Sequence, residues 1–366
     1  MPEREPPTEP QSQAEPQPEP EPQPQPELQP VPEPAPAKAA RAAVLLPEVV
    51  RHAVVIHNPS SAELVGRCPD ALGAAALELG NAVEVRLELP LGRWELQASL
   101  GERVWHLPLP LPAAAQRPER VELTIAPPPP PQAGLAWIAP GPALRGDVLG
   151  VGQEDERPAR VVDIPGFWLA THETSNAEFV AFLNDAGEVA PNWLDLASRK
   201  GHIRRGDDGR FVTERPDLPV ITVSFEGAQA YCAWRTRVTG RRHRLPTEAE
   251  WEKAARGAAS WTYSYGDVYQ RAAANQESGE LRPIAAFAPN GYGLHDMTGN
   301  AFEWVADVYS RDAYANAAAP TEGEYRVLRG GSFVLDGMFL RNSMRMKLRP
   351  GVRADDVGFR VAVDPE

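Results

Sequence analysis

Much of the chain between residues 257 and 360 is rich in glycine, asparagine and aromatic residues that follow no regular period. Neither helical spacing nor strand alternation extends far there, so only short elements can form. Backbone groups buried outside helices and sheets must still find hydrogen-bond partners. The sequence therefore predicts short elements joined by much loop whose buried backbone groups need polar partners.

Three segments upstream of this region have the pattern of amphipathic helices. Residues 175–184 begin with Ser175, a good helix cap, and continue with apolar residues at helical spacing. Residues 225–239 and 248–256 follow the same pattern. We expect these three segments to be the main helices.

The N-terminal end has a different composition. Of the chain's formal charge of -13, the eight Glu and one Arg within residues 1–36 supply -7, and 14 of the 40 prolines also lie there. Such a segment cannot bury a core and favours extended polyproline II. We expect residues 1–40 to be a disordered Pro/Glu/Gln-rich tail, with a spacer role favoured over that of a specific proline-motif ligand.

Short alternating or β-branched runs then indicate a small all-β, sandwich-like domain at residues 41–126. Turn signals separate its expected strands, which are residues 49–56, 82–89, 93–99, 103–109 and 120–125. Five consecutive prolines lie in the stretch 127–134, which we interpret as a stiff linker. The larger domain then covers residues 135–364.

Targeting and cysteine signals are sparse. No stretch approaches the 18 apolar residues of a membrane span, and the N-terminus lacks the basic and apolar parts of a signal peptide. The expectation is a cytoplasmic protein without a membrane segment. Its two cysteines, Cys68 and Cys232, lie in different predicted domains, so we expect Cys232 to be an inert core thiol.

Four motifs of the larger domain resemble, in order and spacing, those of formylglycine-generating enzymes, the sulfatase-modifying factor superfamily. They read PVITVSFEGAQAYCAW at 219–234, RLPTEAEWE at 244–252 and NGYGLHDMTGNAFEW at 290–304. The last is RVLRGGSFVLDGMFLRNSMRMKLRPGVRADDVGFR at 326–360. We therefore identify residues 136–362 as a member of this superfamily, and the resemblance implies its C-type-lectin-like α+β fold.

The same resemblance bears on catalysis. Family enzymes use two cysteines in the last motif to hold copper and react with substrate, and here Leu335 and Leu340 occupy those positions. Leucine can neither bind Cu(I) nor exchange with a thiol. We therefore expect no copper-dependent formylglycine-generating oxidase activity. We expect no iron either, since the seven histidines are scattered without metal-ligand spacing.

The resemblance also implies a structural calcium ion at the GNAFEW motif. Its ligands would be the side chains of Asp296 and Glu303 and the carbonyl groups of Gly299 and Ala301, all hard oxygen donors. The alternative is that the two acids bond to loop amides and arginines without a metal. We favour Ca²⁺, because converging carboxylates repel each other without a cation.

The last motif also contains the predicted binding surface. It carries eight basic and three acidic residues, so it could favour an acidic partner. Its framework also resembles that of variable proteins of diversity-generating retroelements, whose ligand contacts lie between the framework positions. We expect the ligand-binding residues to be Phe333, Val334, Leu335, Asp336, Met338, Phe339, Asn342, Met344, Met346, Lys347 and Arg349.

Two functions remain open at this stage. The favoured one is a non-catalytic, pseudoenzyme-like module that binds a protein or other macromolecular ligand, and that a retroelement could diversify. The alternative is an oxidoreductase of the superfamily with a non-standard active site. No nucleic-acid motif, phosphate-binding loop or nucleophile elbow occurs in the sequence.

Overall fold

The computed structural model describes residues 51–68, 76–186, 190, 192–316 and 320–365. The predicted disordered tail lies outside these residues. The chain divides into two units, Met1–Pro47 and Glu48–Glu366, and the structure described below belongs to the second. In this part of the chain, no helix has the length and apolar character needed to cross a lipid bilayer.

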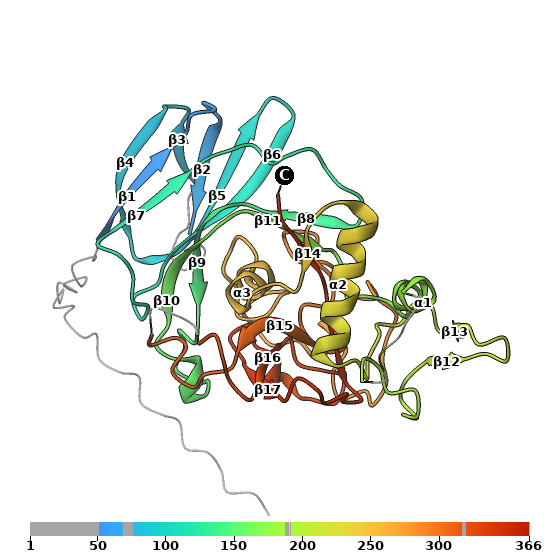
Figure 1. The fold of residues 1–366 in the computed structure, drawn as a ribbon. Coiled ribbons are helices and arrows are strands. Elements are labelled where there is room, and N and C mark those ends of the chain that lie inside the picture. Colours follow the sequence, from blue (N-terminus) through green and yellow to red (C-terminus); the bar gives the residue numbers. More distant parts are fainter. Residues whose placement is uncertain (1–50, 69–75, 187–189, 191, 317–319, 366) are drawn as a thin grey trace, which may run out of the picture. The chain divides into compact units, whose positions relative to one another are not determined.

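The first seven strands form two sheets (Figure 1). The sheet of order β4-β1-β7 contains β1 (Arg51–His57), β4 (Glu84–Pro90) and β7 (Arg120–Thr124). The sheet of order β3-β2-β5-β6 contains β2 (Glu63–Arg67), β3 (Leu77–Gly80), β5 (Gly92–Leu100) and β6 (Arg103–Leu111). Alternate apolar side chains of both sheets, such as Ile56 and Leu96, are buried in one shared core.

Strands occupy all five segments expected from the sequence in this region, with ends shifted by at most two residues. The sequence did not predict β2 and β3. Gly66 interrupts the β-branched pattern of β2, and β3 has only four residues, so neither reaches the length at which alternation is recognisable.

The C-terminal region combines three helices with several short sheets (Figure 1). The helices are α1 (Asn176–Asp185), α2 (Phe225–Thr239) and α3 (Glu248–Arg256). One four-stranded sheet, β14-β19-β11-β8, contains β8 (Leu135–Ile138), β11 (Phe167–Ala170), β14 (His243–Arg244) and β19 (Ala362–Val363). The other, β17-β16-β15-β18, contains β15 (Phe302–Val308), β16 (Arg326–Arg329), β17 (Met346–Leu348) and β18 (Val357–Gly358).

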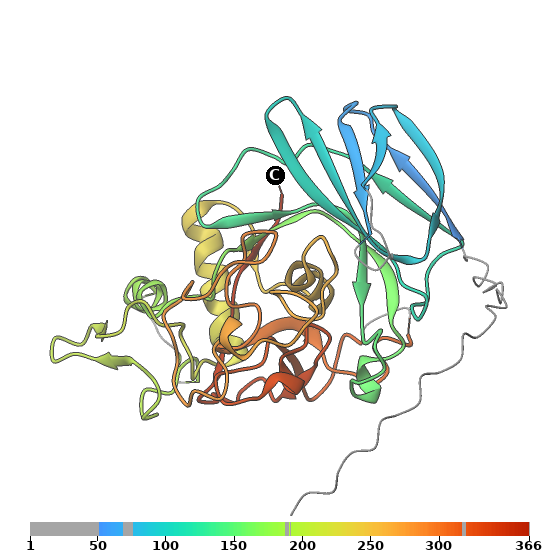
Figure 2. The ribbon, with the colours of Figure 1, turned by 180° about the vertical axis from the view of Figure 1, so that it is seen from behind.

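Two hairpin-like pairs complete the region. Strands β9 (Gly141–Arg145) and β10 (Arg160–Ile164) pair antiparallel, as do β12 (Ile203–Arg205) and β13 (Phe211–Thr213). The β12–β13 pair projects from the rest of the region in both views (Figures 1 and 2). Single 3₁₀ turns occur at Glu154–Glu156, Arg271–Ala273 and Gly337–Leu340.

All three helices lie where the sequence predicts them, because their ends carry strong capping signals. The Ser175 hydroxyl accepts from the backbone N–H of Glu178, whose carboxylate accepts from the N–H of Ser175 in return. Thr247 and Glu250 form the same reciprocal cap at the start of α3. Such caps stabilise a helix end by about 1 kcal/mol, so these helix starts are well determined.

A network of buried ion pairs anchors the loops of this region. Glu252 of α3 pairs with Arg256 at 2.8 Å and with Arg329 at 2.8 Å. Glu248 pairs with Arg345 at 2.6 Å, and the Arg345 side chain is fully buried. The expectation that polar side chains hold the irregular backbone is confirmed, and α3 is the element that these arginines surround.

Candidate ligand-binding site

The structure separates the predicted ligand-binding residues into buried and exposed groups. Phe333, Asn342 and Met344 are at most 2% exposed and belong to the interior. Leu335 and Phe339 are half-buried against the core around α2. The exposed members are Val334, Asp336, Met338, Met346, Lys347 and Arg349. Only these exposed side chains can contribute contact area to a surface site.

The two leucines at the expected copper positions have structural surroundings. Leu340 is 1% exposed and lies against Gly331. The backbone carbonyl of Leu335 accepts from the N–H of Glu277, which ties the last motif to the 275–280 loop. Both side chains therefore fill apolar space next to the candidate surface.

One part of the exposed group surrounds the 3₁₀ turn Gly337–Leu340, here called the η3 surface. Val334 is 51% and Met338 65% exposed, and the Asp336 carboxylate caps the turn by accepting from the N–H of Met338. Gly337 lies so close to the ring of Tyr269 that an added methyl group would overlap it. Tyr269 is itself exposed, so the surface combines apolar and aromatic side chains.

Tyr269 belongs to an aromatic cluster that the sequence analysis missed. Its ring centroid lies 6.0 Å from that of Tyr263, which stacks on Tyr265 at 5.4 Å. The Tyr269 hydroxyl donates to Gln276 at 2.9 Å. The signal was available, since the stretch WTYSYGDVYQ is rich in tyrosine, a residue common in binding surfaces.

The β region holds this tyrosine loop in place. Arg93 of β5 donates two hydrogen bonds to the carboxylate of Asp267, at 2.7 and 2.9 Å. Burial would raise the pKa of Asp267, but the Arg93 guanidinium and the N–H and hydroxyl groups of Thr262 lower it overall. The carboxylate is thus kept ionised, and the pair joins the two regions beside the η3 surface.

The other exposed group lies on β17, the terminal strand of its four-stranded sheet. Met346 is 37% exposed. The Lys347 ammonium lies 4.6 Å from the ring centroid of Tyr309 and 5.4 Å from that of Tyr325. Arg349 pairs with Glu324. A sheet edge can accept an extended peptide, and a lysine on the edge strand restricts which peptides can add to it.

The expected calcium residues lie close to one buried arginine. Arg360 donates to both carboxylate oxygens of Glu303 at 2.6 to 2.9 Å, and Trp251 donates to one of them at 2.7 Å. Asp296 accepts from the N–H of Ala285. The Glu303 carboxylate therefore has its lone pairs occupied by protein donors, and it fits a metal less well than Asp296 does.

Two further acids, Glu173 and Asp296, lie in the electrostatic environment of Arg360. Burial and the carboxyl groups of Asp296 and Glu303 raise the pKa of Glu173 well above its usual range, against the opposite effects of Arg360 and Asn300. Burial alone would lower the pKa of Arg360, but Glu303, Glu173 and Asp296 raise it. Three acidic side chains, those of Glu173, Asp296 and Glu303, thus interact electrostatically with the guanidinium of Arg360. Among the described residues, no three His, Cys, Asp or Glu side chains are grouped as a metal site.

Cys232 is confirmed as a buried, protonated thiol. It is 3% exposed, and burial raises its pKa to about 12, against a small lowering effect of Arg244. Reactive cysteines need a thiolate, so Cys232 is unsuited to redox chemistry.

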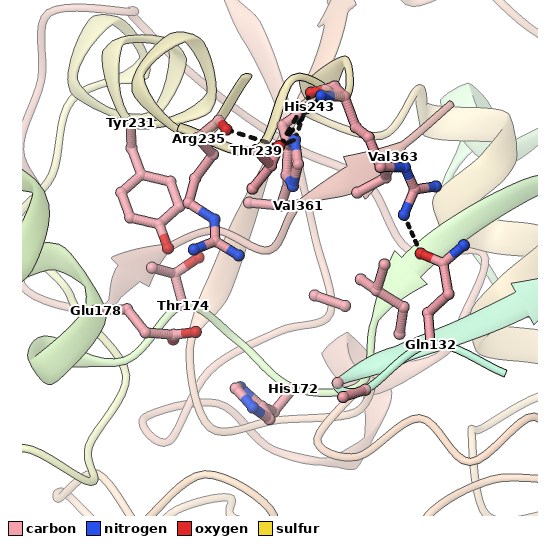
Figure 3. Close-up of a pocket in the computed structure, with 15 residues that line it drawn as sticks. Gln132, His172, Thr174, Glu178, Tyr231, Arg235, Thr239, His243, Val361 and Val363 are labelled. Atoms are coloured by element: carbon pink, nitrogen blue, oxygen red, sulfur yellow. Dashed lines mark hydrogen bonds between the residues drawn. The ribbon is translucent and has the colours of Figure 1, made fainter. Parts of the chain in front are cut away.

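A pocket of about 320 Å³ lies between α2 and the strands β8, β11 and β19 (Figure 3). Three of the polar side chains around it are already bound within the chain. Glu178 caps α1, His172 Nδ1 lies 2.8 Å from the carbonyl oxygen of Glu173, and His243 Nδ1 lies 2.7 Å from that of Arg241. Glu178, His172 and His243 therefore stabilise the local fold through these contacts.

Comparisons with known proteins identify the family. The Sulfatase-modifying factor enzyme 1-like domain matches residues 124–365, so the chain belongs to this family. The resemblance inferred from the four motifs is confirmed. The fold is the sheet-rich α+β fold of this family.

Individual relatives differ in how much of their length is matched. The chain is 35% identical over 241 residues to serine/threonine-protein kinase Pkn1 of Chlamydia trachomatis serovar L2, covering 63% of this chain but only 38% of the kinase. It is 32% identical over 268 residues to the formylglycine-generating enzyme of Bos taurus, covering 58% of this chain and 70% of that enzyme. Treponema denticola variable protein 1 shares the fold, with a TM-score of 0.53 at 20% identity over 74% of this chain and 99% of the other.

Proposed function

We propose that this chain is a non-catalytic binding module, and that its ligand is a protein or other macromolecule that contacts the η3 surface and β17. The observation that carries the proposal is the exposure of Val334, Met338 and Met346 next to tyrosine rings and basic side chains. Apolar and aromatic side chains with a basic rim are the usual composition of a binding patch. The basic groups favour an acidic partner.

Support also comes from the positions that family enzymes use for chemistry. Leu335 and Leu340 stand where the resemblance places the copper-binding cysteines, and Leu340 is packed in the interior. The two cysteines of the chain, Cys68 and Cys232, are both buried. A binding role needs neither copper nor a reactive thiol.

The first prediction concerns the β17 part of the surface. Acidic peptides selected from a display library on the immobilised protein are expected to bind Arg349→Glu at least tenfold more weakly, a loss of about 1.4 kcal/mol. Charge reversal places a carboxylate next to Glu324 and repels an acidic ligand. Titration calorimetry with one selected peptide measures the change.

Arg204→Glu is the matched control, because Arg204 is likewise an exposed arginine paired with a glutamate, Glu214, at 2.7 Å. It lies on β12 and should leave peptide binding unchanged. Equal loss in both variants would show that only net charge matters, and unchanged binding in Arg349→Glu would remove β17 from the proposed surface.

The alternative function is an oxidoreductase with a non-standard active site, and the similarity to the formylglycine-generating enzyme of Bos taurus favours it. Oxygen uptake by chelator-washed protein with added copper or iron and a cysteine peptide separates the two functions. The binding module should show no uptake above that of a heat-denatured sample. Metal-dependent uptake at a steady rate would establish the enzyme.

A diversified variable protein is a narrower form of the binding proposal, supported by the fold shared with Treponema denticola variable protein 1. It requires a reverse-transcriptase gene and a near-repeat of the 333–356 coding segment beside this gene. Their absence from the surrounding DNA would remove this form of the proposal and leave the binding surface itself untouched.

The second prediction concerns calcium at Asp296, Gly299, Ala301 and Glu303. Adding Ca²⁺ to the chelator-washed protein is expected to raise its melting temperature, since a ligand at 100 times its Kd stabilises by about 2.7 kcal/mol. The excess of buried acid over base at Arg360 is the physical reason. Mg²⁺ at the same concentration should have a smaller effect, because it prefers a tighter octahedral site.

Asp296→Asn provides the control for this site. It removes one negative charge and should reduce the calcium-dependent rise. No rise in the original protein, together with no calcium in elemental analysis, would mean that the acids are held by Arg360 and backbone amides alone.

A further inference from the structure

A second pocket, of about 280 Å³, lies beside Phe333 and is formed by loops that are distant in sequence. Residues 199–202, 215–221 and 280–283 contribute its walls. Of the predicted ligand-binding residues, only Phe333 lines it. The pocket is therefore separate from the exposed side chains of the η3 surface and β17.

Basic side chains dominate the polar part of this pocket. Arg199, Lys200, Arg215 and Arg282 line it, and Glu280 is the single acidic residue among its lining residues. The lining thus has a formal charge of +3, four cations less one carboxylate, in a chain whose total is -13. Concentrated charge of one sign in a concave site attracts ions of the opposite sign.

These cations are poorly neutralised by the chain itself. Arg215 lies 4.0 Å from the Asp217 carboxylate, at the limit of an ion pair. Within the described part of the chain, Arg199, Lys200 and Arg282 have no acidic partner within that distance. The Lys200 ammonium donates to the backbone carbonyl of Gly279 at 3.1 Å. The local excess of positive charge is therefore available to a ligand.

The same positive charges affect the pKa of His202. Burial lowers its pKa, and the charges of Arg215 and Lys200 lower it further. A neutral imidazole next to these cations can donate or accept one hydrogen bond without changing the net charge of the pocket.

The remaining wall is apolar and rigid. Leu218, Ile221 and Phe333 are each at most 2% exposed, and the Lys200 ammonium lies 5.8 Å from the centroid of the Phe333 ring. The carbonyl oxygen of Phe333 accepts from the N–H of Ser278 at 3.0 Å. These side chains form a fixed, covered floor, and the apolar lining residues that a ligand can contact are the half-buried Leu281 and Pro283.

We propose that this pocket binds an organic anion, with a carboxylate or phosphate head held by Arg199, Lys200, Arg215 and Arg282 and an apolar body against Leu281 and Pro283. Apolar walls with a few convergent polar groups are the usual form of a small-molecule site. Arginine forks match the geometry of both head groups. The proposal goes beyond the binding of a macromolecule at β17.

The test uses four probes in titration calorimetry: phenyl phosphate, benzoate, inorganic phosphate and benzyl alcohol. Phenyl phosphate or benzoate should bind, more weakly at higher salt, and benzyl alcohol should not. The stronger of the first two identifies the head group. Inorganic phosphate should bind at least tenfold more weakly than phenyl phosphate, because it lacks the apolar body.

Arg282→Ala should weaken binding of the preferred probe at least tenfold. Arg237→Ala is the matched control, since Arg237 is an exposed arginine of α2 outside the pocket. Arg349→Glu should bind the probe normally, so failure here is distinguishable from failure of the β17 surface. No binding of either organic anion at millimolar concentration, or equal loss in Arg282→Ala and Arg237→Ala, would overturn the proposal.

Discussion

Replacing Arg329 with methionine is expected to lower the free energy of unfolding by about 3–5 kcal/mol, because the change removes a buried cation from the network of Glu248 and Glu252 and leaves two buried carbonyl groups without their donor. The Arg329 side chain is fully buried. It pairs with Glu252 at 2.8 Å and with Glu248 at 3.4 Å, and it donates to the carbonyl oxygens of Asn342 and Ser343. Chemical denaturation at pH 7 measures the loss.

The same variant should change the dependence of stability on pH. Burial would raise the pKa of Glu252, but Arg329, Arg256, Arg145 and the Tyr314 hydroxyl together lower it to about 2 from its ordinary 4.5. A lowered pKa in the folded state stabilises the fold above pH 4.5, and this contribution disappears as the pH falls from 4.5 towards 2. In Arg329→Met the pKa of Glu252 rises, so this part of the acid sensitivity becomes smaller.

Arg237→Met is the matched control for Arg329→Met. Arg237 also pairs with an acid, Asp185, but both side chains are exposed, and such pairs contribute about 0–1 kcal/mol. The losses in Arg329→Met and Glu252→Gln should not add in the double variant, because the two side chains pair with each other. A loss below 1 kcal/mol in Arg329→Met would mean that the network does not anchor the loops.

The sequence predicts the helices well and the short strands poorly, for physical reasons. Ser224 and Thr247 cap α2 and α3, so local chemistry determines where these helices begin. Strands such as β12 and β18 have three and two residues. In so few residues, alternation of apolar and polar side chains cannot be recognised. The pairing of these strands depends on residues that are distant in sequence.

The binding surface illustrates a second limit. Eleven selected residues between Phe333 and Arg349 were expected to contact a ligand, yet Asn342 and Met344 are buried. In irregular backbone no period distinguishes inward from outward side chains, so exposure depends on the tertiary fold. Phe333 is buried for the same reason, and it reaches a pocket rather than the open surface.

The basic pocket could not be predicted from sequence, since its cations come from three separate loops. Arg199 and Lys200 are adjacent, but Arg215 and Arg282 are brought to them only by folding. The many basic residues from 199 to 215 were the sequence feature that could have indicated a basic site. It gives no information on whether these side chains converge.

Replacing Arg360 with methionine is expected to destabilise the protein by about 3–5 kcal/mol as well, because Arg360 is the cation shared by three buried acids. Its side chain and that of Glu303 are at most 1% exposed. Arg360→Lys should also destabilise, since lysine cannot reproduce the forked contact with Glu303 and the bond to the His295 carbonyl oxygen. Thermal and chemical unfolding of both variants measures the effect.

Calcium gives this prediction a second readout. If the ion binds beside Asp296, it supplies positive charge where Arg360→Met has lost it, so Ca²⁺ should raise the melting temperature of the variant more than that of the original protein. Equal calcium effects in both proteins would place the ion elsewhere. A loss below 1 kcal/mol in Arg360→Met would show that Glu173, Asp296 and Glu303 take up protons rather than remain charged, since neutral acids need hydrogen bonds but no buried counter-charge.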